Sequence, residues 1–100
     1  MPDRYSIALT LTAYGHLEAL RRYDRNRVLG AIKEQLAFSP DEETRNKKLL
    51  RANPVADWEL RVQPFRVFYE VDKPNASVRV VAVGRKRRDR LIMGDQEIQI

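Results

Sequence analysis

Two groups of arginines have the residue types and the spacing that could do chemistry in this sequence. Arg61 and Arg66 stand on either side of a short turn, and residues 85–90 read Arg-Lys-Arg-Arg-Asp-Arg, with five positive charges in six positions. A guanidinium group donates two parallel hydrogen bonds to a phosphate, which an ammonium group does less well. Basic runs of this kind are typical of nucleic-acid patches. Both groups therefore predict a phosphate-binding surface, and a solvated, salt-bridged face is the alternative for the arginine pair.

A β-hairpin should place Arg61 beside Arg66. Apolar and polar side chains alternate over residues 58–62 and again over residues 65–71, and Gln63-Pro64 separates the two runs. A two-residue turn between such runs predicts antiparallel strands in which the numbers of directly opposed residues have an odd sum. The expected pairs are Val62–Phe65, Leu60–Val67 and Trp58–Tyr69 on the apolar face, and Arg61–Arg66 on the other face.

The second face of this hairpin carries more than the two arginines. Like charges directly opposed across a sheet are unfavourable by about 0.2–1 kcal/mol, so the Arg61–Arg66 pair needs a carboxylate to relieve it. Glu59 and Glu70 share that face and could do so. Phe68 shares it as well, which makes Phe68 a candidate for stacking on a nucleic-acid base.

The first half of the chain predicts a strand and two helices. Residues 5–10 alternate as a first strand. Apolar residues then follow helical spacing after Thr12, which could cap the first helix, and again from Asp24 to about Ala37. Two helices joined this closely predict a helical hairpin.

The second half predicts the sheet. Residues 41–54 show no clear period and are interpreted as a surface connection. A third strand is expected over residues 78–83, where Gly84 ends it, and residues 95–100 could add a short last strand. The element order therefore predicts an α+β fold: an N-terminal strand, the helical hairpin, and three or four further strands in an antiparallel or mixed sheet with the helices on one face.

Length, charge and cysteine content limit the class of protein. The chain has 100 residues, which predicts one domain over residues 1–100, and its net charge of +5 favours a polyanionic partner. The absence of cysteine excludes disulfides, a cysteine-based zinc site and thiol catalysis. The single histidine, His16, has no second ligand near it, so neither a metal nor another cofactor is expected. Without a signal peptide or a membrane-spanning run, we expect a soluble cytoplasmic protein with no membrane partner.

Three segments of the second half together resemble the RelE/ParE toxin superfamily. They are residues 58–62 (Trp-Glu-Leu-Arg-Val), residues 65–71 (Phe-Arg-Val-Phe-Tyr-Glu-Val) and residues 81–87 (Val-Ala-Val-Gly-Arg-Lys-Arg). The family pattern is an aromatic-X-Leu-Arg strand, a Tyr/Phe-Arg-Val/Leu-X-Tyr strand and a Val-Gly-basic-basic segment, and the resemblance covers about residues 47–92. It implies a sheet with two helices on one face, a basic groove on the other, and an acidic antitoxin that wraps the toxin.

The resemblance implies one of two activities. RelE-like members cut mRNA in the A site of the 70S ribosome, whereas ParE-like members inhibit DNA gyrase. In a RelE-like enzyme Arg66 would lie at the scissile phosphate with Arg61 nearby, and Lys86 or Arg87 would be the basic residue after the glycine. The reaction would be metal-free attack of a ribose 2′-hydroxyl on the adjacent phosphate, with cations stabilising the developing charge. The remaining candidates for RNA binding are Lys47, Lys48, Arg51, Phe68, Arg85 and Arg88.

Two departures from the family pattern bear on the activity. Glu59 stands where RelE has a lysine, and Ile92 stands where many relatives have a tyrosine that serves near the 2′-hydroxyl. Tyr69 is expected to point into the core, so it does not replace that tyrosine. The sequence leaves three hypotheses: first a ribosome-dependent mRNA endoribonuclease, then a ParE-like gyrase inhibitor, and third a catalytically inactive binding module with the toxin fold.

Overall fold

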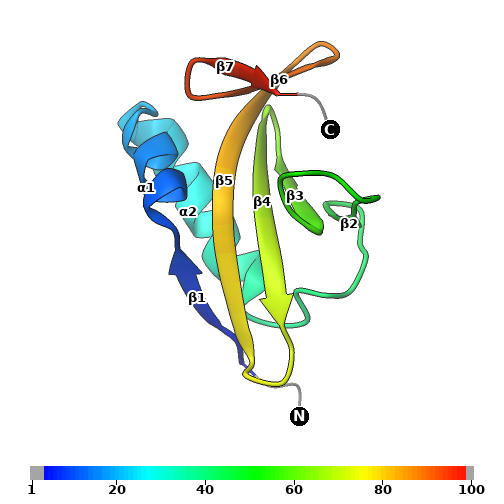
Figure 1. Ribbon diagram of the computed structural model, residues 1–100. Helices are drawn as coiled ribbons and strands as arrows, with labels where there is room; N and C mark the ends of the chain where they lie inside the picture. The colour runs from blue at the N-terminus through cyan, green and yellow to red at the C-terminus, as the bar shows by residue number, and fades with distance from the viewer. Residues whose placement is uncertain (1–3, 99–100) are drawn as a thin grey trace.

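The protein is a mixed β-sheet with two helices on one face, as the sequence predicts. The computed structural model describes residues 4–98 (Figure 1). The elements within them are β1 (Ser6–Leu9), α1 (Leu11–Glu18), α2 (Arg22–Leu36), β2 (Lys47–Leu49), β3 (Trp58–Val62), β4 (Phe65–Asp72), β5 (Ser77–Arg87), β6 (Arg90–Met93) and β7 (Gln96–Ile98). The strand order is β2-β3-β4-β5-β6-β7, and β1 pairs with β5 in parallel while the other neighbours are antiparallel.

The β3–β4 hairpin has the predicted register. Arg61 faces Arg66 across the ladder, and the three apolar pairs expected on the other face are also present. Trp58 and Tyr69 stack with their ring centroids 6.1 Å apart, and the Tyr69 hydroxyl donates a hydrogen bond of 2.8 Å to the carbonyl oxygen of Pro40. The alternation of apolar residues and a two-residue turn are both local features, which is why the sequence is enough to predict this register.

The sheet has a hydrophobic cluster on each face. The larger one lies under the helices, where α1 packs against β1 and β5 and α2 packs against β3 and β4. The smaller one lies on the opposite face, the face of Arg66, and consists of Ala56, Phe68, Ala82, Leu91 and Met93. Neither helix described in residues 4–98 is long and apolar enough to cross a membrane.

Four expectations about the elements differ from the structure. The second helix begins at Arg22 rather than after Asp24, which lies in its first turn and pairs with Arg21. The third strand does not end at Gly84 but continues to Arg87, because β6 pairs with its last three residues. The connection after α2 contains β2, a strand of three residues that is too short to show a period of two. The cap of α1 is Thr10 rather than Thr12: its hydroxyl accepts a hydrogen bond from the N–H of Ala13. The expected last strand is present as β7, and residues 99–100 lie outside the described residues.

Gly84 lets the end of β6 lie close to β5. A Cβ atom at this position would lie 2.9 Å from Cδ1 of Leu91, 3.0 Å from the carbonyl oxygen of Ile92 and 3.1 Å from Cγ of Met93. Ordinary van der Waals contact requires more room than this, and one of these atoms belongs to the backbone, which cannot move alone. The glycine of the Val-Gly-basic-basic segment is therefore explained by packing in this chain.

Two side chains fill a gap in the hydrogen bonding of β5. One edge of β5 pairs with β1 up to Val80 and with β6 from Arg85. Between these partners the hydroxyl of Thr10 donates to the carbonyl oxygen of Val81 (3.1 Å), and the N–H of Val83 donates to Nδ1 of His16 (3.1 Å). Backbone polar groups left without a partner away from water are costly, so α1 completes the ladder that neither neighbouring strand reaches.

We expect Gly84→Ala to lower the free energy of unfolding by about 1–3 kcal/mol, because the added methyl group would clash with Leu91, Ile92 and Met93 of β6. Chemical denaturation measures this change. Gly30→Ala in α2 is the matched control: its Cβ meets nothing within 4 Å. A helical alanine there should raise stability by about 0.5–1 kcal/mol. Equal or greater stability of Gly84→Ala relative to the parent would contradict the close approach of β6.

We expect the stability of this protein to fall as the pH drops through the range in which an exposed histidine titrates. Burial lowers the pKa of His16 from its ordinary value of 6.5, and a protonated Nδ1 could not accept the N–H of Val83. The folded chain then binds a proton less readily than the unfolded chain, so lowering the pH below about 6.5 favours unfolding until the folded pKa is passed.

The measurement is the free energy of unfolding between about pH 7.5 and 5.5 for the parent and for His16→Asn. The asparagine oxygen can still accept the N–H of Val83 but does not titrate, so the variant should lack this part of the pH dependence. Burial raises the pKa of Glu70 from its usual value, but that group is present in both proteins and cancels in the comparison. Identical pH profiles would show that His16 does not contribute.

Candidate functional site

A single carboxylate holds both arginines of the predicted pair. Nε of Arg61 lies 3.0 Å from Oε2 of Glu59, and Nε of Arg66 lies 3.7 Å from Oε1 of the same side chain. The Arg61 side chain is 42% exposed, whereas those of Arg66 and Glu59 are 10% and 13% exposed. Glu59 therefore relieves the charge repulsion between directly opposed arginines.

Arg66 is the more constrained of the two arginines. Its Nη1 donates to Oε1 of Gln63 (3.1 Å) and to the carbonyl oxygen of Phe65 (3.0 Å). Burial lowers the pKa of the Arg66 guanidinium from its ordinary value, Glu59 acts to raise this pKa, and Arg61 acts to lower it. The partners of Arg66 compensate for the loss of water, and they also occupy donors that a phosphate would need.

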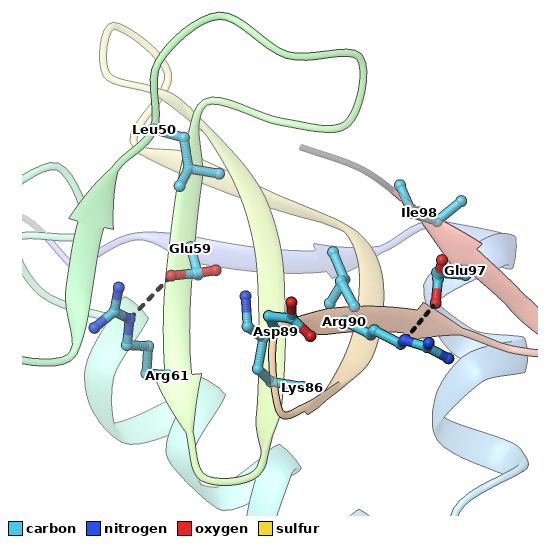
Figure 2. A pocket seen from close by; sticks show the side chains of 9 residues that line it. Leu50, Glu59, Arg61, Lys86, Asp89, Arg90, Glu97 and Ile98 are labelled. Carbon is cyan, nitrogen blue, oxygen red and sulfur yellow. Dashed lines mark hydrogen bonds and ion pairs between the residues drawn. The ribbon is translucent and has the colours of Figure 1, made fainter.

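Arg61 and Lys86 line one cavity, which we call the β3–β6 pocket (Figure 2). The cavity has a volume of about 580 Å³. Three cations and three carboxylates line it, so its formal charge is balanced, and the Arg90–Glu97 pair contributes one of each with Nε and Oε1 3.5 Å apart. The lining residues are Leu50, Glu59, Arg61, Lys86, Asp89, Arg90, Leu91, Glu97 and Ile98.

The basic run is divided between the two faces of the sheet. Lys86 lies on the face of Arg66, whereas Arg85 and Arg87 lie on the helix side, where the guanidinium of Arg85 sits 5.6 Å from the centre of the Phe65 ring. They line a second cavity of about 580 Å³, which we call the α1–β5 pocket. Its lining residues are His16, Ala19, Leu20, Pro64, Phe65, Val83, Gly84, Arg85, Lys86, Arg87, Arg88, Ile92 and Gly94.

Two of the candidates for RNA binding are buried. Phe68 lies on the predicted face, but its exposed fraction is 0% because the second hydrophobic cluster covers it, so it cannot stack on a base in this structure. Lys47 is 5% exposed, and its Nζ donates to the carbonyl oxygens of Ser39 (2.9 Å) and Gln35 (3.4 Å) at the end of α2. A lysine that binds the last carbonyls of a helix is a capping residue, not a nucleic-acid contact.

Of the remaining candidates for RNA binding, Arg85 and Arg88 line the α1–β5 pocket, and Lys48 and Arg51 lie in or after β2. Lys48 faces Glu59 across the β2–β3 ladder and is half-buried, while Arg51 is exposed beyond the end of β2. Neither lines the β3–β6 pocket. The sequence analysis did not predict that Asp89 and Glu97 line this pocket. Asp89 is the one acidic residue within the basic run, and Glu97 is brought to the pocket by the pairing of β7 with β6.

The position expected to carry a tyrosine is not beside Arg66. Ile92 faces Arg85 across the β5–β6 ladder and lines the α1–β5 pocket. Tyr69 lies in the core as predicted, and burial raises the pKa of its hydroxyl well above the usual range. Among residues 4–98, the lining of the β3–β6 pocket includes neither tyrosine nor histidine, and no cluster of three or more His, Asp or Glu side chains is placed to hold a metal ion.

We expect Glu59→Gln to lower the free energy of unfolding by about 1–3 kcal/mol, because it removes the charged partner of a largely buried arginine. Glu97→Gln is the matched control, since Glu97 pairs with Arg90 at a well exposed position. Exposed pairs contribute about 0–1 kcal/mol. Denaturation of the two variants side by side checks this, and an equal effect would mean that Glu59 does not support Arg66.

Solved toxin structures share this fold. The toxin–antitoxin complex RelBE2 from Mycobacterium tuberculosis matches with a TM-score of 0.73 and 23% identity over 84% of this chain and 93% of that chain. The archaeal RelE–RelB complex from Pyrococcus horikoshii matches with a TM-score of 0.69 and 17% identity over 85% and 98% of the two chains. The isolated RelE toxin of E. coli matches with a TM-score of 0.67 and 23% identity over 85% and 87%. At these identities the likeness concerns the fold.

The sequence itself matches a family model. No curated protein matches the chain significantly. Residues 7–90 match the model described as the ParE toxin of the type II toxin–antitoxin system parDE, which spans all elements from β1 to the start of β6. Since this match covers most of the chain and the fold agrees with it, the chain belongs to the ParE toxin family, within the RelE/ParE toxins of type II toxin–antitoxin systems.

Proposed function

We propose that this toxin acts by binding its target, as a ParE-like inhibitor of DNA gyrase, rather than by cutting RNA. The observation that carries the proposal is the state of Arg61 and Arg66, which are both engaged by Glu59. Metal-free RNA cleavage relies on cations aimed at the charge that develops on the phosphate. Here both arginines are ion-paired with Glu59, and the pocket around Arg61 holds as many carboxylates as cations.

A pocket lining that, among the described residues, has no tyrosine or histidine supports the same conclusion. A general base must lie within hydrogen-bond reach of the 2′-hydroxyl, either directly or through one water. Ile92 cannot accept a proton, and it faces the other pocket. Of the residues that line the β3–β6 pocket, only Glu59, Asp89 and Glu97 could accept one, and Glu59 and Glu97 form ion pairs.

Ribosome-dependent mRNA cleavage is the second candidate. It is favoured by one observation: Arg61 and Lys86, two of the predicted catalytic residues, line the same pocket. The third predicted residue, Arg66, lies on the same face, and the fourth, Arg87, lies on the helix side. Binding of mRNA at the ribosome would have to displace Glu59 from the arginines.

The partner that controls this toxin is proposed to be an acidic antitoxin. The RelBE2 and RelE–RelB structures are complexes of a toxin with its antitoxin. The net charge of +5 on this chain favours an acidic partner. In this proposal neither a metal nor another cofactor takes part.

The decisive experiment combines two measurements on one protein. Purified chain is added to gyrase that supercoils relaxed plasmid, and the chain is separately expressed in a pulse without antitoxin while new mRNA 5′ ends are mapped by primer extension. We expect inhibition of supercoiling and no new ends within translated codons, because both arginines are ion-paired with Glu59 and Ile92 replaces the tyrosine expected near the 2′-hydroxyl.

The variant for this experiment is Arg61→Gln combined with Lys86→Gln. Both residues are on the pocket surface, so the double variant tests the pocket without removing the buried Arg66. If cuts occur and the double variant slows them by about 10²–10³ or more, the chain is a nuclease and the gyrase proposal is wrong. Growth arrest with neither effect would also exclude gyrase, and no growth arrest after clean expression would indicate an inactive binding module.

A further inference from the structure

The two pockets differ in charge although they have similar volumes. The β3–β6 pocket is lined by three cations and three carboxylates. The α1–β5 pocket is lined by four cations and no carboxylate, and Lys86 borders both. The face with uncompensated positive charge is therefore the helix side, opposite the arginine pair that the sequence singles out. An anionic group gains more from a pocket of one sign than from a balanced one.

The arginines of the α1–β5 pocket have donors to offer a ligand. Within the described part of the chain no ion pair involves Arg85, Arg87 or Arg88. Arg85 is positioned by its contact with the Phe65 ring. An aromatic ring offers no oxygen or nitrogen acceptor, so this contact leaves the N–H groups of the guanidinium available for hydrogen bonds to a ligand.

His16 adds a neutral donor to the same pocket. Its Nδ1 accepts the N–H of Val83, so the neutral ring carries its proton on Nε2. The rest of the lining includes the apolar side chains of Leu20 in the α1–α2 connection, Phe65 on β4 and Ile92 on β6. A volume of about 580 Å³ lies within the range of small-molecule sites. Cations beside an apolar wall match a nucleotide, which has a charged phosphate and a flat base.

The turn between β5 and β6 keeps an arginine where another residue would fit better. Arg88 has φ 59°, in the left-handed region that glycine and asparagine adopt most readily. A non-glycine residue held there costs about 1–2 kcal/mol. Arg88 also lines the α1–β5 pocket, so its side chain is available to a ligand there.

From these observations we infer that the α1–β5 pocket is a second binding site, which takes the phosphate of an unpaired nucleotide with its base against the apolar wall. Arg85, Arg87 and Arg88 bind the phosphate, and Leu20, Phe65 and Ile92 contact the base. A base within a duplex could not enter such a pocket, so the ligand is single-stranded or free. The site does not depend on whether the toxin inhibits gyrase or cuts RNA.

The experiment measures binding of a fluorescent single-stranded DNA of about 12 nucleotides by anisotropy over a range of salt concentrations. DNA lacks the 2′-hydroxyl, so ribonuclease activity cannot affect the result. We expect Arg85→Gln combined with Arg87→Gln to weaken binding about tenfold or more, the effect of losing charge-assisted hydrogen bonds. The slope of log affinity against log salt should become shallower by about 1.4, since each phosphate contact with a single strand contributes about 0.7.

A further double variant gives the experiment its control. Arg22→Gln combined with Lys33→Gln removes the same charge from exposed positions of α2 and should change affinity by less than about threefold. If this variant weakens binding as much as the Arg85/Arg87 variant, the inferred site is wrong.

Arg88→Asn separates binding from folding. Asparagine suits a left-handed position, so the variant should be at least as stable as the parent and still bind the strand several-fold more weakly. Unchanged affinity would overturn the role of Arg88 and, together with unchanged affinity of the Arg85/Arg87 variant, the site itself.

Competition distinguishes the two sources of the nucleotide. Displacement of the labelled strand by adenosine 5′-monophosphate but not by adenosine would show that the phosphate is recognised and that a free nucleotide suffices. Displacement only by unlabelled strand would assign the site to nucleic acid. Displacement by adenosine as effectively as by its monophosphate would contradict a phosphate site.

Discussion

The hydrogen bonding of β5 is the constraint on which the rest of this structure depends. β5 pairs with β4 along one edge, and β1 and β6 share the other edge without meeting. Backbone groups buried between them need partners, and Thr10 and His16 supply these from α1 and its cap. The helix is thereby held against β5 next to the point where its pairing with β6 ends. Figure 1 shows β5 running the length of the molecule, with β1 and the helices on one side of it in this view and β4 and β3 on the other.

The continuation of β5 beyond Gly84 determines on which face of the sheet each cation of the basic run lies. Successive side chains of a strand point to opposite faces, so Arg85 and Arg87 face the helices while Lys86 faces the arginine pair. Had the strand ended at Gly84, the basic run would have been a loop free to form one patch. Because the strand continues, residues of one basic run line two pockets: Arg85 and Arg87 line the α1–β5 pocket, and Lys86 also lines the β3–β6 pocket.

Carboxylates make the two pockets chemically different. Glu59 on β3, Asp89 in the β5–β6 turn and Glu97 on β7 all reach the β3–β6 pocket, and none lines the other. Toxins of this fold therefore need not use the same face for the same purpose, since a fold does not fix a function. In this chain the arginines that match the family pattern are stabilised by ion pairs, and those without ion pairs in the described residues lie on the helix side.

Local features of the sequence determined the hairpin, its register and the opposition of Arg61 and Arg66, because a period of two and a two-residue turn leave one pairing that buries the apolar side chains. The same parity placed Tyr69 in the core and Phe68 on the arginine face. Only the tertiary structure decided which of these faces would be covered. Phe68 is buried by Ala56, Leu91 and Met93, which lie far from it along the chain. Burial depends on such distant segments, and parity along one strand carries no information about them.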